Sequence, residues 1–161
     1  MGVSVSASTA IIVAGLFFAF TAFYPVAANG FERVTDAQHD VGERALERQN
    51  TAIGIDAAEN RTVDGGDELV INATNDGSTG LVVSDTTLVV DNEYVDLADV
   101  NTTVYDRDGA TGETDLWLTD ETLEIVVVDA DLETTIVSEA ERVVVVTESG
   151  VRDATAVEGG A

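Results

Sequence analysis

The sequence predicts an N-terminal transmembrane α-helix that extends into a helical stalk and is followed by an all-β, immunoglobulin-like sandwich. Three observations lead to this fold class. Residues 7–28 carry no charge, and the apolar residues that follow them recur at helical spacing. From Asp56 onward the chain changes to short alternating segments with turn residues about every ten positions. We therefore expect a membrane anchor helix over residues 1–31, a stalk over 32–55 and an extracytoplasmic sandwich over 56–161.

The composition indicates one folded, very acidic domain. The chain has 161 residues, of which 45% are hydrophobic, so it has room for one domain of ordinary size plus an added segment. It carries 31 acidic residues against 7 basic ones and contains no Lys. Because the acidic residues alternate with Val, Ile and Leu, the charge belongs to a folded surface and not to a disordered tail. Molar salt screens the self-repulsion of such a surface, and we expect a halophilic archaeal source.

The composition and motifs of the chain exclude several function classes. An acidic surface without clustered Lys and Arg does not suit a nucleic-acid partner. The absence of Cys removes disulfides, thiolate metal sites and Cys nucleophiles, and we expect the single His39 to be a solvated helix position. The sequence contains no recognisable Ser-His-Asp set or Gly-rich phosphate loop. We expect a protein that is not an enzyme and that has no catalytic, cofactor-binding or metal-binding residue.

The apolar segment has the length of a membrane span. About 20 apolar residues cross a hydrocarbon core at 1.5 Å per residue, and residues 7–28 meet this length. Tyr24 and Phe31 lie where interfacial aromatic residues occur, and Pro25 is expected to kink the helix. The segment is long for a cleaved signal and no positive charge precedes it. Residues 26–28 are still compatible with a cleavage site, so a removed signal stays open as an alternative.

The orientation of this span rests on two opposed observations. Arg33, Arg44 and Arg48 follow the span, and the positive-inside rule would place them in the cytoplasm. Acidic residues in the same stretch cancel this charge, and three Asn-x-Ser/Thr sequons, which mark exposed loops of exported domains, lie beyond it. The candidate N-glycosylation sites are Asn60, Asn72 and Asn101. We expect a single-pass protein of the cell membrane with its C-terminal domain outside the cell.

An apolar stripe continues along the predicted stalk. Its members follow a 3,4 repeat that is broken by Gln38 and Arg48. The stripe comprises Ala27, Phe31, Val34, Val41, Ala45, Ala52 and Ile55. Two interpretations stay open: the stripe packs against the chain's own β domain, or it pairs with a parallel second helix in which Gln38 fixes the register.

Seven segments of the C-terminal region read as strands. They cover residues 68–74, 84–91, 101–105, 122–129, 134–137, 142–148 and 151–157. The first alternates clearly, and the Asn-Asp-Gly-Ser-Thr-Gly stretch at residues 75–80 is a turn by composition. Seven short strands in about 100 residues are typical of an immunoglobulin-like sandwich.

Two strands contain unbroken apolar runs, at residues 125–128 and 143–146. Such runs require apolar cover on both faces, which either the stalk, a loop or a second copy could provide. We expect a homodimer that uses this surface. The expected self-association face comprises Val143, Val144, Val145, Val146, Ile125 and Val127.

Two further residue patterns have both a functional and a structural interpretation. Trp117 has the residue type of a binding hot spot, but we expect it in the core between the sheets. The stretch Asp106-Arg107-Asp108-Gly109 partly resembles a calcium loop, yet the EF-hand spacing fails. We expect a hairpin loop between Tyr105 and Leu116 instead.

Several motifs together resemble the archaellum accessory protein family FlaF. A Met-Gly-x-Ser-Val-Ser start runs into Ala-Ile-Ile-Val-Ala-Gly at residues 10–15, followed by similar stretches at 27–34 and 36–38. Val-Ile-Asn-Ala-Thr-Asn-Asp-Gly-Ser-Thr at 70–79 and Leu-Trp-Leu-Thr-Asp-Glu-Thr-Leu at 116–123 continue the resemblance in order. Thr119-Asp120 stands where the family usually has Pro-Gly, so the turn there is expected to differ.

The resemblance implies a stator, which is a structural component of the archaellum machinery. Its sandwich would bind the surface-layer protein, and other archaellum proteins of the FlaG type would be further partners. FlaG shares the plan of helix and sandwich, and archaellins and pilins share the apolar helix. A filament subunit, or a FlaG-like or pilin-like component of a type IV pilus-like structure, is therefore the alternative, although such subunits normally carry basic residues before a cleavage site. A generic exported binding module is a third hypothesis.

Overall fold

The computed structural model describes residues 3–63, 66–112 and 114–159. The chain divides into two compact units, Met1–Arg44 and Ala45–Ala161. The first unit is helical and the second contains every strand. Helix α1, Val3–Asn50, begins in the first unit, and its last turns, residues 45–50, belong to the second.

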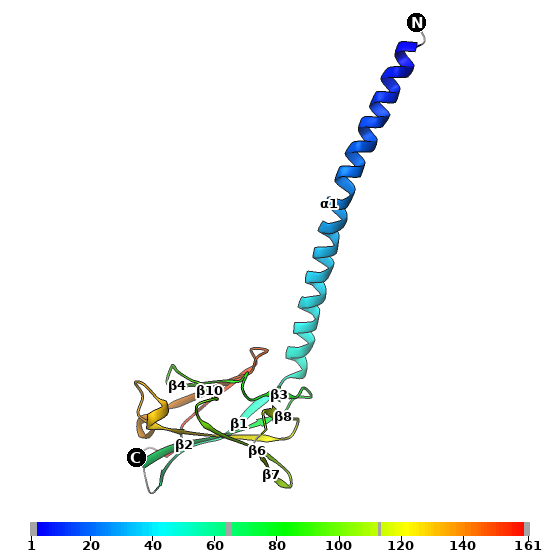
Figure 1. The fold of residues 1–161 in the computed structure, drawn as a ribbon. Coiled ribbons are helices and arrows are strands. Elements are labelled where there is room, and N and C mark those ends of the chain that lie inside the picture. The colour runs from blue at the N-terminus through cyan, green and yellow to red at the C-terminus, as the bar shows by residue number, and fades with distance from the viewer. Residues whose placement is uncertain (1–2, 64–65, 113, 160–161) are drawn as a thin grey trace. The chain divides into compact units, whose positions relative to one another are not determined.

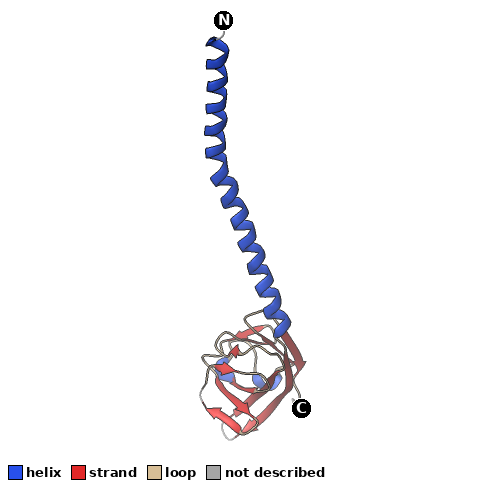
Figure 2. Cartoon of the chain, turned by 90° about the vertical axis from the view of Figure 1, so that its right-hand side faces the viewer, coloured by secondary structure: helices blue, strands red, loops and turns tan. Residues whose placement is uncertain are grey.

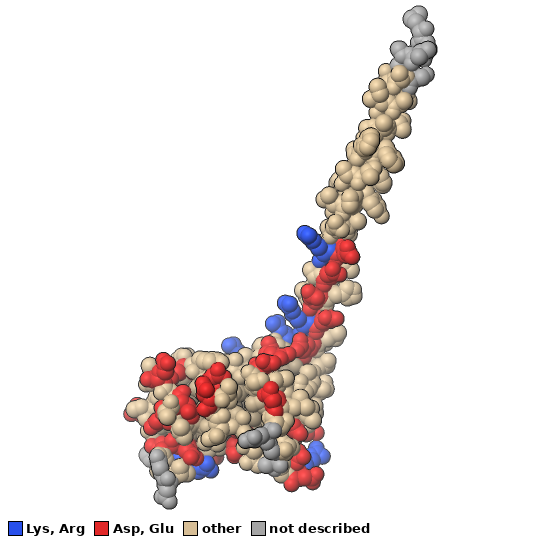
Figure 3. Space-filling view, viewed as in Figure 1, with Lys and Arg blue, Asp and Glu red and all other residues tan. Residues whose placement is uncertain are grey.

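Helix α1 is 48 residues long and passes through Pro25 without interruption. Figure 2 shows it as one continuous helix. Its apolar part is long enough to cross a membrane by length and composition, as predicted. In Figure 3 this part bears no acidic or basic side chain, whereas the rest of the helix bears both.

The helix ends earlier than the sequence suggested. The stalk prediction extends to residue 55, but Asn50 is the last helical residue and Ile55 lies in strand β1, Ile53–Val63. The amide groups of Ser78 and Thr79 donate to the Asn50 carbonyl oxygen at 2.8 and 3.3 Å. Beyond that point the backbone pairs with β2, Gly66–Asn75, beginning at Ile53 opposite Asn75. Sheet pairing therefore replaces the helix, and this end of the apolar stripe was assigned wrongly.

The larger sheet has five antiparallel strands in the order β1-β2-β9-β6-β7. Its other members are β9, Thr122–Val128, β6, Asn101–Asp106, and β7, Gly109–Gly112. β2 and β9 pair over seven residues in the middle of this sheet. Figure 1 shows the strands crossing beneath the β4 and β10 region.

The second sheet has four antiparallel strands in the order β11-β10-β4-β5. Its strands are β4, Thr87–Val90, β5, Glu93–Val95, β10, Arg142–Val146, and β11, Arg152–Ala156. A two-stranded sheet joins β3, Leu81–Val82, to β8, Leu116–Trp117. Two short 3-10 helices follow β9: η1, Asp129–Asp131, and η2, Val137–Glu139.

Alternate residues from both sheets form one core, and this confirms the predicted sandwich. Ile125 and Val127 of β9 and Val143 and Val145 of β10 are fully buried. Trp117 is fully buried too, and its Nε1 donates to the Glu121 carbonyl oxygen at 2.8 Å. Its predicted place in the core is confirmed, and the binding hot-spot interpretation is wrong because no part of the side chain reaches solvent.

One predicted strand, residues 134–137, is absent. The carboxylate of Glu93 accepts hydrogen bonds from the backbone amides of Glu133, Thr134 and Thr135 and from the Thr134 hydroxyl. These amide groups are therefore not available to a sheet, and the segment leads instead into η2. The other six predicted strands and the turn at residues 75–80 are present, with ends that differ by a few residues.

The expected self-association face needs correction. The 125–128 and 143–146 runs belong to different sheets and cannot form one continuous face. Within that set, Val143, Val145, Ile125 and Val127 point into the core, while Val144 and Val146 lie half-buried on the outer side. Strict alternation in a two-layer sandwich forces this split. Homodimerisation itself stays a prediction.

Candidate functional site

The apolar part of α1 is the first candidate, because its large side chains are exposed. Ile11, Phe18 and Phe23 are each about 70% accessible. Burying a side chain of this size is worth about 1.5–3 kcal/mol, so water is a poor environment for a row of them. The Thr21 hydroxyl donates to the Phe17 carbonyl oxygen at 2.6 Å, which satisfies its polar group inside the helix, as lipid requires. This segment is suited to a membrane.

The charged part of the helix follows in the same element. His39 is exposed, as expected. Phe31, Val34 and Val41 of the apolar stripe are exposed as well. The stripe therefore offers an apolar surface along this part of the helix, and its pairing with a second helix stays a prediction.

The second candidate is the junction between the end of α1 and the sandwich, defined by residues 47–52, 75–79 and 117–121. Asn75 is fully buried at its centre. Its side-chain amide donates to the carbonyl oxygens of Thr79 at 2.9 Å and Trp117 at 3.1 Å, and its Oδ1 accepts from the Gly77 amide at 3.0 Å. The backbone of Asn75 also bonds Glu121 and Asp120, at 3.0 and 2.9 Å. One residue thus links β2, the following turn and the segment after β8.

Gly77 brings this turn against the helix end. A Cβ atom at Gly77 would lie 2.6 Å from both the Ala52 nitrogen and the Asn50 carbonyl oxygen. Real Cβ atoms do not approach backbone atoms so closely, so any larger residue would force the two segments apart. The close fit and the bonds from Ser78 and Thr79 to Asn50 fix the last helical turn to the sandwich.

A second attachment comes from the loop between β10 and β11. The Arg48 Nε donates to the Ser149 carbonyl oxygen at 2.9 Å. Burial raises the pKa of the neighbouring Glu148 carboxyl, and the nearby carboxylates of Asp85 and Glu47 raise it further. Three acidic side chains from three separate segments therefore meet beside the helix end. Their mutual repulsion opposes the junction unless salt screens it or a proton is shared.

Other acidic side chains bind the chain itself. The Asp106 carboxylate accepts hydrogen bonds from the amides of Asp108 at 2.7 Å and Gly109 at 2.9 Å, which closes the tight turn between β6 and β7. A hairpin is therefore present, as expected, but it pairs β6 with β7 and is shorter than predicted. Leu116, the expected end of the loop, lies in β8, which pairs with β3. Within the described ranges, no group of three or more His, Cys, Asp or Glu side chains is arranged to hold a metal ion.

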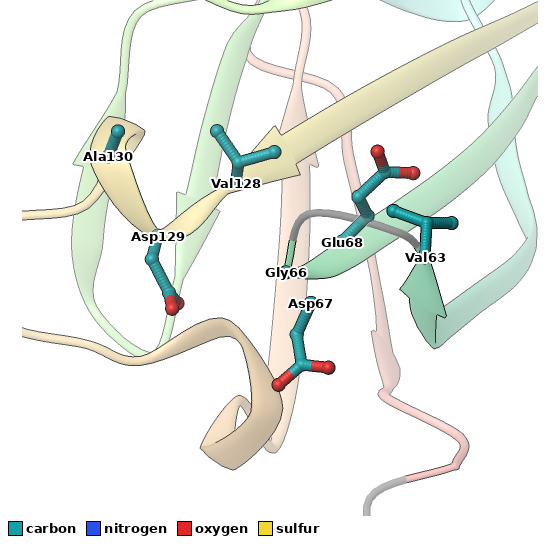
Figure 4. A pocket seen from close by; sticks show the side chains of 7 residues that line it. All are labelled: Val63, Gly66, Asp67, Glu68, Val128, Asp129 and Ala130. Carbon is teal, nitrogen blue, oxygen red and sulfur yellow. The ribbon is translucent and has the colours of Figure 1, made fainter.

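A hollow of about 440 Å³ lies where β2 begins and β9 ends (Figure 4). Three carboxylates line it, and each makes a structural contact: Asp67 accepts from the Thr62 hydroxyl at 2.7 Å, Glu68 pairs with Arg61 at 2.9 Å, and Asp129 accepts from the Val137 amide at 2.7 Å. The three lining carboxylates are thus all engaged in contacts within the domain.

The three sequons lie in different environments. Asn60 is in β1, and its Nδ2 and Oδ1 atoms are shielded from solvent. Asn72 lies half-buried in β2 between two neighbouring strands. Asn101 is exposed and begins β6. Sequence reasoning could not rank these three sites, and it did not find Asn75 at the junction, because both properties depend on distant contacts.

The chain was compared with protein families, curated proteins and solved structures. No family model matches the chain, and no curated protein matches it. Among solved structures, the chain is similar to the archaellum periplasmic stator protein FlaG from Sulfolobus acidocaldarius. That similarity has 13% sequence identity and a TM-score of 0.42, and it covers 66% of this chain and 98% of the other.

Proposed function

We propose that this chain is a membrane-anchored structural component of the archaellum machinery, a stator, and not an enzyme. Its apolar helix would hold it in the cell membrane as a single-pass protein with the β-sandwich outside the cell. The sandwich would bind the surface-layer protein, and other archaellum proteins would be further partners. The halophilic archaeal origin expected from the charge belongs to the same proposal.

The observation that carries the proposal is the junction. A stationary element that resists torque needs a firm attachment between its anchor helix and its binding domain. The Asn75 bonds, the close approach at Gly77 and the Arg48–Ser149 bond give the last helical turn several independent attachments to the sandwich. This architecture supports a mechanical role.

The sequence resemblance to FlaF also supports the role of a stator. The two segments that most resemble FlaF in the domain, residues 70–79 and 116–123, are more than 35 positions apart in the chain. They meet at the junction, where Asn75 of the first segment bonds Trp117, Asp120 and Glu121 of the second. The residues that carry the resemblance are thus the ones that build the attachment of the helix.

Deletion of the gene in its source cells tests the stator proposal. We expect the deletion to abolish swimming while filaments still assemble, because a stator transmits torque without being part of the polymer. Wild-type protein should restore swimming, and Gly77→Val, which separates the turn from the helix end, should restore it poorly at equal membrane abundance. Gly42→Val, at a helix position with open space around it, is the matched control. Motile deletion cells would refute the proposal.

A filament subunit of the archaellin, FlaG or pilin type is the second candidate function. The exposed apolar helix favours it too, since such a helix could pack inside a filament as well as in lipid. Peptide mapping of the mature N-terminus separates the two. An N-terminus at or next to Met1 supports the anchor, whereas a new N-terminus near the start of the apolar run supports the filament subunit. The proposed surface-layer partner is tested by measuring, in molar salt, whether the isolated β-sandwich domain binds purified surface layer.

A further inference from the structure

The three sequons differ in how accessible their Asn side chains are to a bulky sugar. N-linked glycans are bulky and occupy exposed surface. The acceptor Nδ2 must therefore face solvent in the folded domain, and the space around it must be open.

Asn60 fails this requirement. Its Nδ2 and Oδ1 are both buried, and neither has a hydrogen-bond partner among the described residues. Its backbone amide donates to the Glu158 carbonyl oxygen at 3.0 Å, and the Glu158 amide donates to the Ala58 carbonyl oxygen at 2.7 Å. A glycan on Asn60 would require this side chain to leave its buried position in the part of β1 that pairs with the Glu158 segment.

Asn72 is held in the interior of the five-stranded sheet. It lies opposite Ala57 of β1 on one side and Glu124 of β9 on the other, and it is half-buried. Paired strands therefore flank Asn72 on both sides, whereas Asn101, among the described residues, is paired on one side only, with Val126 of β9. A sugar here would also cover the outer face of that sheet.

Asn101 meets the requirement. It is exposed, begins β6, and follows the turn closed by the Asp99 amide bonding the Asp96 carbonyl oxygen at 3.1 Å. Beside it lies a second hollow of about 440 Å³, open to solvent. Val100 supplies partly exposed apolar surface to this hollow, and the buried Val83 and Leu97 lie at its base. Ser84, Thr102 and Thr114 supply hydroxyl groups, of which that of Ser84 donates to the lining carboxylate of Asp115 at 2.8 Å. A sugar ring presents C–H faces and hydroxyl groups, so this mixed lining suits it.

We propose that Asn101 is the N-glycan acceptor of this protein and that the proximal sugar of the glycan lies over the adjacent hollow. This inference rests on the proposed export of the domain, since N-glycan transfer takes place on exported chains. The glycan would shield the exposed start of β6.

Glycopeptide mass spectrometry on the protein purified from its own cells tests the assignment. Because the chain has no Lys, cleavage after Arg yields residues 49–61 with Asn60 and residues 62–107 with both other sequons. A second cleavage after Glu93 separates Asn72 from Asn101. We expect the glycan mass on residues 94–107 alone. Asn101→Gln and Thr103→Ala should each remove it, whereas Thr103→Ser, which preserves the sequon, should keep it.

A reporter sequon distinguishes failure of this proposal from failure of export. Asp120→Asn creates one with Thr122, at an exposed position whose φ of 63° Asn tolerates. A glycan on the reporter but not on Asn101 would overturn the assignment while leaving export intact. A glycan on Asn60 or Asn72 would also overturn it. Absence of glycan from every site would overturn it and would count against export.

Hydrogen exchange tests the place of the sugar. If the proximal sugar covers the hollow, amides of residues 97–102 should exchange several-fold more slowly in the glycosylated protein than in Asn101→Gln. Residues 142–146, in the opposite sheet, serve as the internal control and should exchange equally in both. Equal exchange at 97–102 would show that the glycan does not rest there.

Discussion

At the residue scale, Asn75 holds three segments together, and its loss should be costly. Asn75→Ala would remove the acceptor of the buried Gly77 amide and the side-chain donor to the carbonyl oxygens of Thr79 and Trp117. A buried polar group that loses its partner costs about 1–3 kcal/mol, so we expect a loss of about 1–3 kcal/mol or more in the free energy of unfolding.

Asn75→Asp should be still more harmful, because it keeps one acceptor but places a negative charge against two carbonyl oxygens. Ser78→Ala, in the same turn but with an exposed side chain, is the control and should change stability by less than about 0.5 kcal/mol. Thermal unfolding in molar salt measures all three. A fully stable Asn75→Ala would show that the junction does not depend on this side chain.

Glu93 gives the domain a defined pH dependence. Backbone amides of the 133–135 loop, with the amide of Glu133 first, and the Thr134 hydroxyl lower the pKa of its carboxyl to about 2. Because an unfolded Glu titrates near 4.3, this contribution is fully present above about pH 4.3 and is lost as the pH falls towards 2. Unfolding at pH 7 should therefore show Glu93→Gln to be less stable than wild type, and the difference should shrink at pH 3.

Glu133→Gln is the matched control for this measurement. It removes one charge from the same loop, while the Glu133 backbone amide that binds Glu93 stays in place. A Glu93→Gln difference that is independent of pH would contradict the assigned role of the carboxylate.

At the scale of elements, sequence patterns predicted six strands but missed β1, the longest one, whose first residues were expected in the stalk. They also missed the short strands β3, β5, β7 and β8. β2, β9 and β10 have four or more residues with clear alternation or β-branched runs, which is enough to define a period. β3 and β8 have two residues each and owe their pairing to contacts between positions 81–82 and 116–117. The end of α1 was misplaced for a similar reason, because the groups that bind Asn50 lie in a turn nearly 30 residues later.

The outer face of the smaller sheet carries an apolar row that the sequence did not reveal. Register places Ala154, Val144, Val89 and Tyr94 side by side across β11, β10, β4 and β5. Directly opposed residues in antiparallel strands share a face, so this row points outward with Val144. Tyr94 is 61% exposed. If the domain dimerises, this row is the surface that we expect it to use.

Paired substitutions in β10 test both the alternation and the dimer. Val145→Asp buries an unpaired charge in the core and should prevent folding. Val144→Asp, one position away, should fold normally because its side chain points outward. Sedimentation of the domain in molar salt should show a dimer for wild type and a monomer for Val144→Asp. A monomeric wild-type domain would refute dimerisation, and a folded Val145→Asp would contradict the assigned register.

At the scale of the whole molecule, negative charge is spread over the second unit. Residues 45–161 contain 27 of the 31 acidic residues and five of the seven arginines. Figure 3 shows acidic side chains distributed across the visible face of this unit. The ion pairs between described residues are Arg61–Glu68, which is partly exposed, and Arg107–Asp120, which is largely exposed. Exposed pairs contribute little, so most of the repulsion is balanced only by the solvent.

The second unit should therefore fold in molar salt and lose structure on dilution. The Debye length is about 3 Å at 1 M salt and about 30 Å at 0.01 M, so repulsion among these carboxylates becomes long-ranged in dilute buffer. Circular dichroism of residues 45–161 should show a β spectrum in molar NaCl that disappears in dilute buffer. Salt also strengthens apolar burial, whereas sucrose favours the folded state without screening charge. Added to the domain in dilute buffer, sucrose should therefore restore less β structure than NaCl does.

Glu148, Asp85 and Glu47 meet beside the end of the helix, so Glu148→Gln should lower the salt concentration that the domain needs to fold. Glu139→Gln on η2 should lower this concentration less. An unchanged spectrum in dilute buffer would contradict the halophilic interpretation of the charge.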